Sequence, residues 1–250
     1  MIKKESKVRL DRALVDRGLT ASREQARALI LAGRVLVNDF KIDKAGSLVT
    51  ESADVRIVGD LNPFVSRGGL KLQGALAAFG IDVTGLIVLD IGASTGGFTD
   101  CLLQTGAQKV YALDVGYGQL AWKLRSDDRV SPIERTNIRY FDGSILKDPL
   151  DMATVDASFI SLKIILPKVV SLIRPGGIII ALIKPQFEVG RGQVGKQGVV
   201  SDPLQHQTVI EEITQLCRLL RLEEIAVCES PLHGPAGNRE FFICARRPKA

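Results

Sequence analysis

Residues 86–98 read LIVLDIGASTGGF, and this stretch decides the fold that we expect. Residues 86–91 form an apolar run of strand length, which leads directly into a glycine-rich turn. Gly96 and Gly97 then open a helix, an arrangement that lets the backbone approach a nucleotide-like ligand closely. The stretch therefore predicts a strand, a turn and a helix, with a small-molecule site at the turn.

The same alternation of strands and helices continues along the second part of the chain. Strands are predicted at residues 86–91, 109–114, 131–136, 155–158, 177–183, 223–229 and 240–245, and helices at residues 69–79, 97–104, 118–125, 163–173 and 202–220. Such alternation predicts an α/β fold with a mostly parallel, seven-stranded, doubly wound sheet. Residues 10–58 instead predict two short helices and a small sheet. We expect an α+β domain at residues 1–60, a linker at 61–64 and the α/β domain at 65–250.

The glycine-rich turn differs from the dehydrogenase fingerprint GxGxxG, because it reads GASTGG and follows the acidic residue Asp90. A carboxylate there suits a cationic ligand better than a pyrophosphate. The loop is similar to the first motif of class I methyltransferases, whose cofactor S-adenosylmethionine carries a sulfonium and an amino group. This resemblance implies a cofactor site made of Asp90, Gly92, Ala93, Ser94, Gly96, Gly97, Phe98, Asp114, Asn137 and Ile138.

Four charged side chains are expected at the carboxyl edge of the sheet. Asp156 and Lys184 follow neighbouring parallel strands, and Glu240 begins the last strand. Lys71 lies at the front of the helix that precedes the first strand of the sheet. In order and placement they resemble the Lys-Asp-Lys-Glu tetrad of FtsJ-type RNA 2′-O-methyltransferases. The resemblance implies that Asp156 and Glu240 orient Lys184, which either accepts the proton of a ribose hydroxyl or steers that hydroxyl, and that Lys71 fixes the ribose.

Other methyltransferase chemistries lack their signatures here. The sequence DASFISL after the fourth strand contains no Asn-Pro-Pro-Tyr or Asp-Pro-Pro-Tyr motif, which disfavours an amino-methylating enzyme. No cysteine follows a proline, which disfavours the cytosine-carbon enzymes that use a thiol nucleophile. The resemblance of the tetrad to FtsJ-type enzymes implies a ribose hydroxyl as the acceptor.

The front of the chain carries the basic charge. Residues 1–44 contain eleven Lys and Arg against six Asp and Glu, an excess of five that equals the net charge of the whole chain. Such a patch indicates a polyanion partner, although a solvated basic face would give the same count. Residues 22–38, SREQARALILAGRVLVN, resemble the αL RNA-binding module of a small-subunit ribosomal protein. The RNA contacts that we expect are Arg9, Arg12, Arg23, Arg27 and Arg34 here, with Arg67, Arg191 and Lys196 in the second domain.

Three further segments extend the resemblance over nearly the full chain. Residues 64–69 (FVSRGG), 158–162 (SFISL) and 184–188 (KPQFE) are similar to the TlyA family, described as 2′-O-methyltransferases of cytidines in ribosomal RNA and often labelled haemolysins. The resemblance implies S-adenosylmethionine as cofactor and ribosomal RNA or ribosomal subunits as partner. A membrane-active haemolysin and a non-catalytic ribosome-binding factor are the alternatives. Residues 189–201 form either a loop that closes over RNA or a plain surface loop.

Composition excludes several other classes of protein. The apolar runs stop far short of the roughly 20 residues that span a bilayer, and the charged start does not resemble a secretory signal. We therefore expect a cytoplasmic protein without a membrane span. Four scattered cysteines predict reduced thiols rather than disulfides, and two histidines without ligand spacing predict no metal site.

Overall fold

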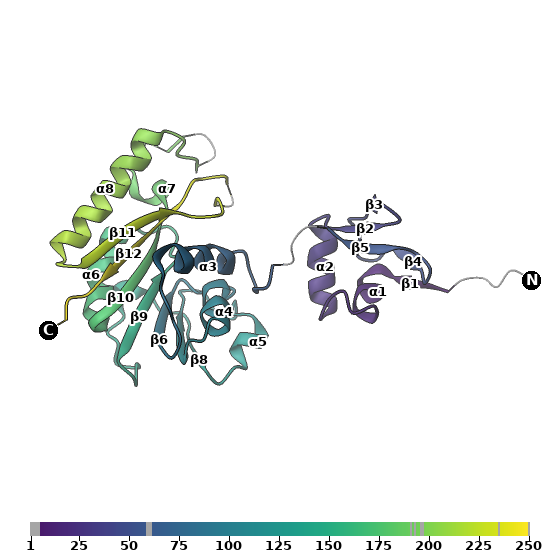
Figure 1. The fold of residues 1–250 in the computed structure, drawn as a ribbon, viewed down its shortest axis with the longest axis horizontal. Coiled ribbons are helices and arrows are strands. Elements are labelled where there is room, and N and C mark those ends of the chain that lie inside the picture. Colours follow the sequence, from purple (N-terminus) through teal and green to yellow (C-terminus); the bar gives the residue numbers. More distant parts are fainter. Residues whose placement is uncertain are drawn as a thin grey trace, which may run out of the picture. The chain divides into compact units, whose positions relative to one another are not determined.

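The structure is a computed structural model, and it describes residues 6–58, 62–190, 192, 194–195, 198–234 and 236–249. The chain divides into two compact units, Met1–Leu61 and Asn62–Ala250 (Figure 1). Phe64, which the sequence places at the end of a linker, is buried in the second unit. Two of the expected RNA contacts, Arg191 and Lys196, lie outside the described residues.

The first unit packs two helices against short antiparallel strands. Its elements are β1 (Lys7–Arg9), α1 (Leu10–Asp16), α2 (Arg23–Leu31), β2 (Val35–Val37), β3 (Phe40–Lys41), β4 (Leu48–Thr50) and β5 (Val55–Ile57). Strand β1 pairs with β4, and β2 lies between β3 and β5. Ser22 caps α2 by accepting the N–H of Gln25, and Leu10, Leu14 and Ile30 are fully buried between the helices and strands. The small α+β domain predicted from the sequence is confirmed.

The second unit is built around one large sheet. Its elements are α3 (Gly68–Phe79), β6 (Ile87–Ile91), α4 (Gly97–Gln104), β7 (Lys109–Leu113), α5 (Trp122–Arg125), β8 (Val130–Ile133), the 3₁₀ turn η1 (Ile138–Tyr140), β9 (Leu150–Val155), α6 (Leu162–Leu172), β10 (Ile173–Ile183), α7 (Pro185–Glu188), α8 (Pro203–Leu219), β11 (Glu223–Glu229) and β12 (Phe241–Arg246). The strand order is β11-β12-β10-β9-β6-β7-β8, and β12 runs antiparallel to both its neighbours. The mostly parallel seven-stranded sheet is confirmed.

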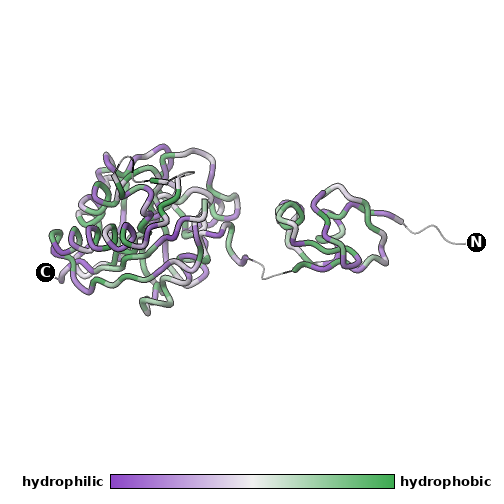
Figure 2. The backbone as a smooth tube through the Cα atoms, turned by 90° about the horizontal axis from the view of Figure 1, so that it is seen from above, coloured by the Kyte–Doolittle hydropathy of each residue, from purple (hydrophilic) through white to green (hydrophobic). Residues whose placement is uncertain are grey.

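Apolar side chains cover both faces of this sheet. Along β6, Leu89 and Ile91 pack into a core with α6 and α8, whereas Val88 packs on the opposite face with α3 and α4. Strands buried on both sides read as continuous apolar runs, and Figure 2 colours such runs green. The result is a three-layer α/β/α unit in which the glycine-rich loop leaves the carboxyl end of a central strand.

Two predicted elements differ most from the structure, and the strands predicted at residues 131–136 and 177–183 occupy Val130–Ile133 and Ile173–Ile183. The strand predicted at residues 155–158 is wrong, because β9 occupies Leu150–Val155 and ends where the prediction began. The charged residue Asp151 interrupts the apolar run at the start of β9, so the residue pattern contains no strand signal there. Its carboxylate accepts the N–H of Ile87 at 2.8 Å and pairs with Arg174 at the amino-terminal edge of the sheet. The helix predicted at residues 118–125 covers only Trp122–Arg125. Asp156 nevertheless follows the strand directly and lies at the carboxyl edge.

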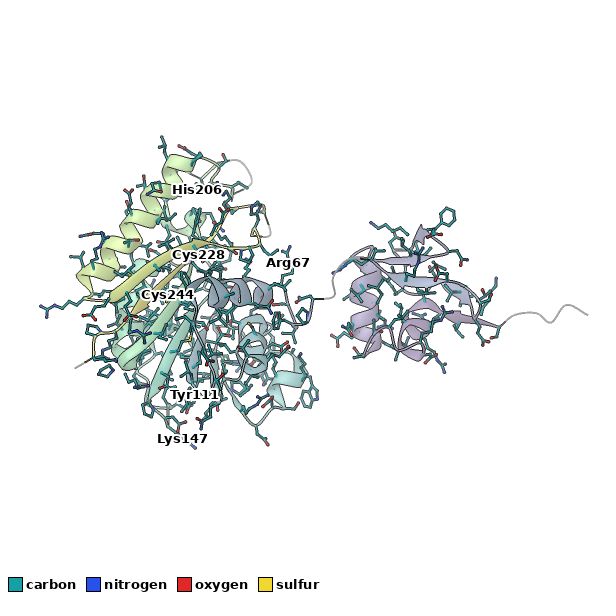
Figure 3. The ribbon with its side chains drawn as sticks, in the orientation of Figure 1. Arg67, Tyr111, Lys147, His206, Cys228 and Cys244 are labelled. Carbon is teal, nitrogen blue, oxygen red and sulfur yellow. The ribbon has the colours of Figure 1, made fainter. Side chains whose placement is uncertain are left out.

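All four cysteines are free thiols. Burial raises the pKa of Cys101 to about 12 and the pKa of Cys217 and of Cys244 to about 11, so these thiols stay protonated and are poor nucleophiles. Cys228 and Cys244 lie in the adjacent strands β11 and β12 (Figure 3). Among the described residues, no helix is long and apolar enough to cross a membrane.

Candidate active site

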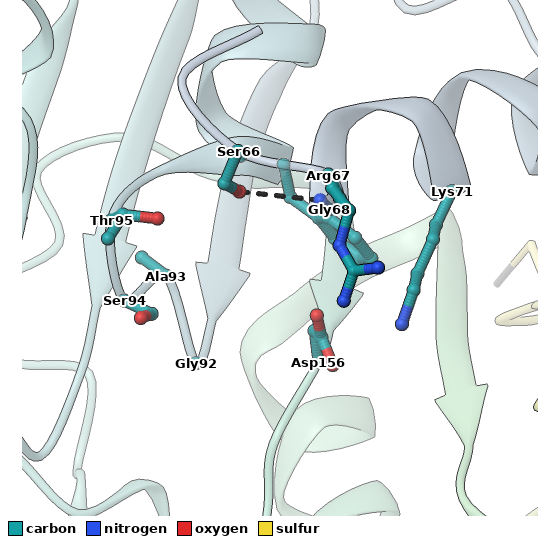
Figure 4. Close-up of a pocket in the computed structure, with 11 residues that line it drawn as sticks. Ser66, Arg67, Gly68, Lys71, Gly92, Ala93, Ser94, Thr95 and Asp156 are labelled. Carbon is teal, nitrogen blue, oxygen red and sulfur yellow. Dashed lines mark hydrogen bonds between the residues drawn. The ribbon is translucent and has the colours of Figure 1, made fainter. Parts of the chain in front are cut away.

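The glycine-rich loop after β6 borders a cavity of about 230 Å³ at the carboxyl edge of the sheet (Figure 4). Three segments line it: the front of α3, the loop itself, and the residue that follows β9. The lining residues are Ser66, Arg67, Gly68, Lys71, Gly92, Ala93, Ser94, Thr95, Gly97, Phe98 and Asp156. Of the expected cofactor contacts, five lie in this wall, and Ser66, Gly68 and Thr95 are additions that the sequence did not single out.

Close backbone contacts explain the glycines of the loop. Gly92 has a φ of 84°, and a Cβ there would lie 2.6 Å from the carbonyl oxygen of Asp156. A Cβ on Gly97 would lie 2.2 Å from Ser66 Oγ and 3.0 Å from the backbone nitrogen of Gly69. The loop is therefore pressed against the end of β9 on one side and the front of α3 on the other, so that backbone atoms form much of the cavity wall.

Asp90 lies beneath the loop rather than in the cavity wall. Its carboxylate is fully buried and accepts hydrogen bonds from Thr99 Oγ1 at 2.7 Å and Thr154 Oγ1 at 2.9 Å. Burial raises the pKa of Asp90 to about 6, although the threonine hydroxyls partly oppose this shift. The side chain thus links β6 to α4 and β9, and it supports the loop from below.

Asp114 lines a second, small cavity of about 10 Å³ that shares Ala93 and Ser94 with the first. Its carboxylate accepts the N–H of Ser94 at 2.8 Å and the N–H of Gly116 at 2.7 Å. Asn137 and Ile138, the other expected contacts along this edge, line neither cavity. Asn137 caps η1, and the Ile138 side chain is buried in the core.

The four predicted catalytic residues form two ion pairs. Lys71 Nζ lies 2.5 Å from Glu240 Oε2, and Lys184 Nζ lies 2.6 Å from Asp156 Oδ1. All four side chains are largely buried, with exposed fractions between 1% and 23%. Lys71 and Asp156 line the same cavity, and in Figure 4 the Arg67 side chain points toward the space between them. The two pairs therefore meet at one site.

The pairing differs in one respect from the sequence prediction. Glu240, expected to orient Lys184, instead holds Lys71, which reaches it from α3. The second partner of Lys184 is Ser158, whose Oγ accepts a hydrogen bond from Nζ at 2.9 Å. Nothing in the spacing of the sequence distinguishes these two arrangements, because both lysines carry the same charge and lie at the same edge.

Aromatic side chains at this edge were not predicted as site residues. Phe159 is 90% exposed, has a φ of 63° and packs against Phe187 with the ring centres 5.0 Å apart. Tyr117 is also exposed, and the Arg135 guanidinium lies 4.1 Å from its ring centre. The sequence did contain a signal for these site residues: they are aromatic residues in loops that follow strands, where no apolar periodicity assigns them to the core. A positive φ in a non-glycine residue is strained and is frequent at functional sites.

The expected RNA contacts of the first unit are engaged with other groups of that unit. Arg9, Arg23 and Arg27 all pair with one buried carboxylate, that of Asp11. The two remaining contacts are Arg12, which pairs with Asp16 at 3.3 Å, and Arg34, which donates to the carbonyl oxygen of Val58.

The fold and the site together define a class of protein. A central strand leads into a glycine-rich loop, and carboxylates that follow its two neighbouring strands line the two adjoining cavities. The last strand runs antiparallel, and these features define a Rossmann-like methyltransferase domain. The FtsJ-like methyltransferase family matches residues 64–247, and the S4 domain matches residues 8–55. The chain belongs to the TlyA family of FtsJ-like methyltransferases that carry an S4 domain.

Named relatives agree with this assignment. The 16S/23S rRNA (cytidine-2'-O)-methyltransferase TlyA of Mycobacterium tuberculosis is 45% identical over 241 residues, which cover 96% of this chain and 90% of the relative. Hemolysin A of Brachyspira hyodysenteriae is 40% identical over 94% of this chain and 98% of the relative. The solved structure of a Streptococcus thermophilus protein named as a hemolysin has a TM-score of 0.77 and 41% identity, and the match covers 99% of this chain and 90% of that one.

Proposed function

We propose that this chain transfers a methyl group from S-adenosylmethionine to the 2′-hydroxyl of a cytidine ribose in ribosomal RNA. The observation that carries the proposal is the pair of buried lysine–carboxylate contacts beside the loop cavity, Lys184 with Asp156 and Lys71 with Glu240. The substrate class is supported by the name of the Mycobacterium tuberculosis relative and by the S4 domain in front.

The residues around the two cavities fit S-adenosylmethionine. Backbone groups of residues 92–98 would hold the methionine part, with the Asp156 carboxylate facing its positive charges. Asp114, already oriented by two backbone N–H groups, has lone pairs left for ribose hydroxyls. When bound, this cofactor supplies a methyl group on a sulfonium, which is electrophilic without any metal ion.

Lys184 is the residue that we assign to the hydroxyl of the substrate. The ribose oxygen gains a methyl group and loses its proton, so a group beside it must accept that proton or guide it away. Asp156 and Ser158 hold the Lys184 amine in one place at the carboxyl edge. Lys71, fixed by Glu240 in the same wall, would bind the ribose or its phosphate.

The exposed aromatic residues suit a nucleotide substrate. Phe159 presents a free ring face close in the chain to Asp156, and base stacking on such a ring contributes about 1–3 kcal/mol. Arg67 in the cavity wall and Arg135 beside Tyr117 add positive charge for phosphate groups. We assign Phe159 to the base of the target nucleotide, which must leave its stack to bring its ribose to Lys184.

The test is methylation of purified ribosomal subunits with isotope-labelled S-adenosylmethionine, followed by mass spectrometric mapping of ribose methylation. The wild-type chain should label a cytidine 2′-oxygen, and Lys184→Ala should lower the rate about 100-fold or more while its affinity for S-adenosylmethionine, measured by calorimetry, is retained. Lys163→Ala is the matched control, because Lys163 is a lysine of the same unit that forms an exposed ion pair with Glu212. Absence of label in both subunits would refute the proposal.

A further inference from the structure

The first unit contains a fully buried carboxylate that holds three arginines. Asp11, in the first turn of α1, accepts hydrogen bonds from Arg9 Nε at 3.1 Å and Arg9 Nη2 at 3.2 Å. Arg23 Nη2 lies 2.8 Å and Arg27 Nε 3.2 Å from the same carboxylate. The three arginines come from β1 and from one face of α2, so they meet only because α1 packs on α2.

This arrangement exceeds what neutralising a buried acid requires. One arginine would balance the charge of Asp11, but three are present, so the cluster has a net charge of +2. The Arg9 side chain is 49% exposed, and those of Arg23 and Arg27 are 51% and 53% exposed. Each guanidinium has five N–H bonds, and Asp11 uses one or two nitrogens of each. About half of each side chain therefore remains accessible to a ligand.

The charge of the cluster is maintained over the whole physiological range. The hydrogen bonds from Arg9, and then those from Arg23 and Arg27, hold the pKa of the Asp11 carboxyl well below its usual range, despite the opposing effect of burial. Asp11 thus remains a carboxylate. Its two oxygens fix the positions of three long side chains that would otherwise sample many rotamers.

We propose that Asp11 is a positioning residue, which assembles Arg9, Arg23 and Arg27 into one preformed guanidinium surface for the phosphates of structured RNA. Guanidinium groups suit this ligand because their planar forks bind phosphate oxygens in pairs. Their ordering before binding lowers the entropy lost on association. The inference deepens the function proposed above and rests on it for the identity of the partner.

The direction in which one substitution changes RNA affinity distinguishes this inference from attraction by net charge alone. Asp11→Asn removes a negative charge from a basic domain, so attraction by net charge alone would tighten RNA binding. We expect the opposite: an equilibrium dissociation constant for purified ribosomal subunits about tenfold higher, the size expected when one or two long side chains must be ordered during binding. The matched control is Asp16→Asn, which removes the same charge from an exposed i,i+4 pair with Arg12 and should bind as tightly as wild type or more tightly.

Kinetics supply a readout that a purely structural defect would not give. With the ribosomal subunits as substrate, Asp11→Asn should raise KM about tenfold and leave kcat within about twofold, since the cluster is remote in sequence from the catalytic residues and acts on binding. Thermal unfolding followed by circular dichroism shows whether the variant is folded. If it is not folded, the full-length triple variant Arg9→Lys, Arg23→Lys and Arg27→Lys tests the inference instead. This variant should fold, because it keeps every positive charge and changes only half-exposed side chains.

The triple variant should also bind the subunits about tenfold more weakly, with the salt dependence of binding nearly unchanged because the number of cations is the same. Equal or tighter binding by Asp11→Asn, or by the triple variant, would overturn the inference, as would absence of subunit binding by the wild-type chain. The binding experiment tests this inference independently of the proposed methyltransferase activity. A wild-type chain that binds subunits in an Asp11-dependent manner but transfers no methyl group would refute the proposed function and leave this inference standing.

Discussion

Replacement of Asp90 by asparagine should stabilise the methyltransferase domain, and the gain should depend on pH. The carboxyl is fully buried between two threonine hydroxyls, and its pKa is raised from 3.8 to about 6. Because this carboxyl ionises less readily in the folded chain than in the unfolded chain, its ionisation lowers the free energy of unfolding as pH rises. The cost is absent below about pH 3, grows mainly between pH 4 and 6, and is complete above about pH 7.

The size of the effect follows from the same shift. A difference of about 2 pKa units corresponds to about 3 kcal/mol at 1.36 kcal/mol per unit. Asparagine carries no charge at any pH, and its amide can still bond to Thr99 and Thr154, since a threonine hydroxyl both donates and accepts. The variant should therefore exceed the wild-type chain in free energy of unfolding by about 1 kcal/mol near pH 4.5 and by about 2–3 kcal/mol at pH 7.5.

The assay must report on the second unit alone. Urea unfolding at several pH values serves, with the folded fraction read from a brief hydrogen-exchange pulse at one fixed pH on peptides that contain β6. Asp82→Asn is the control with the opposite sign, because hydrogen bonds from Thr84 lower the pKa of this exposed carboxyl. That variant should lose stability at neutral pH, and the loss should shrink only as pH falls below about 4. A flat difference for Asp90→Asn between pH 4.5 and 8, or a less stable variant at pH 7.5, would refute the reasoning.

Three further changes test the site. Gly97→Ala places a methyl group 2.2 Å from Ser66 Oγ and against the backbone of α3, so calorimetry should show at least about tenfold weaker binding of S-adenosylmethionine; an unchanged affinity contradicts this. Phe159→Ala should lower kcat/KM on ribosomal subunits about tenfold without changing the melting temperature, and an unaltered rate would remove the stacking role. Lys71→Met and Glu240→Gln should each cost about 3 kcal/mol in urea unfolding, and the double variant clearly less than the sum; additivity would show that the buried pair is not coupled.

The elements that the sequence predicted well are those with strong local signals. The apolar run that ends at Ile91 and the glycines behind it specify a buried strand and a tight turn, whatever the rest of the chain does. Alternating strands and helices then restrict the topology, because parallel strands require crossover connections. For that reason the positions of Asp156 and Lys184 at the carboxyl edge could be predicted even though the bounds of β9 were not.

Partner choice within the site could not be predicted in the same way. Glu240 pairs with Lys71 and not with Lys184, and Ser158 takes the place expected for Glu240. These choices depend on how far each side chain reaches from its element, and on Gly234, where a Cβ would lie 2.6 Å from Glu240 Oε1. Such contacts join residues far apart in the chain, so no local pattern encodes them. The exposed ring of Phe159 could not be predicted either, because its position depends on a positive φ that only the folded loop imposes.

The arginines of the first unit show why a charge count is an incomplete guide to binding. The count treats Arg9, Arg23 and Arg27 as three independent cations, and Asp11 as a subtraction from the basic patch. In the folded unit the acid is the centre of the patch: it is buried, and it holds all three guanidinium groups from one side while their other halves remain exposed. Removing it would raise the net charge and release the side chains at the same time. Affinity for a phosphate backbone then depends on which effect is larger, and the ordering of three long side chains outweighs one unit of charge that is already neutralised by its neighbours.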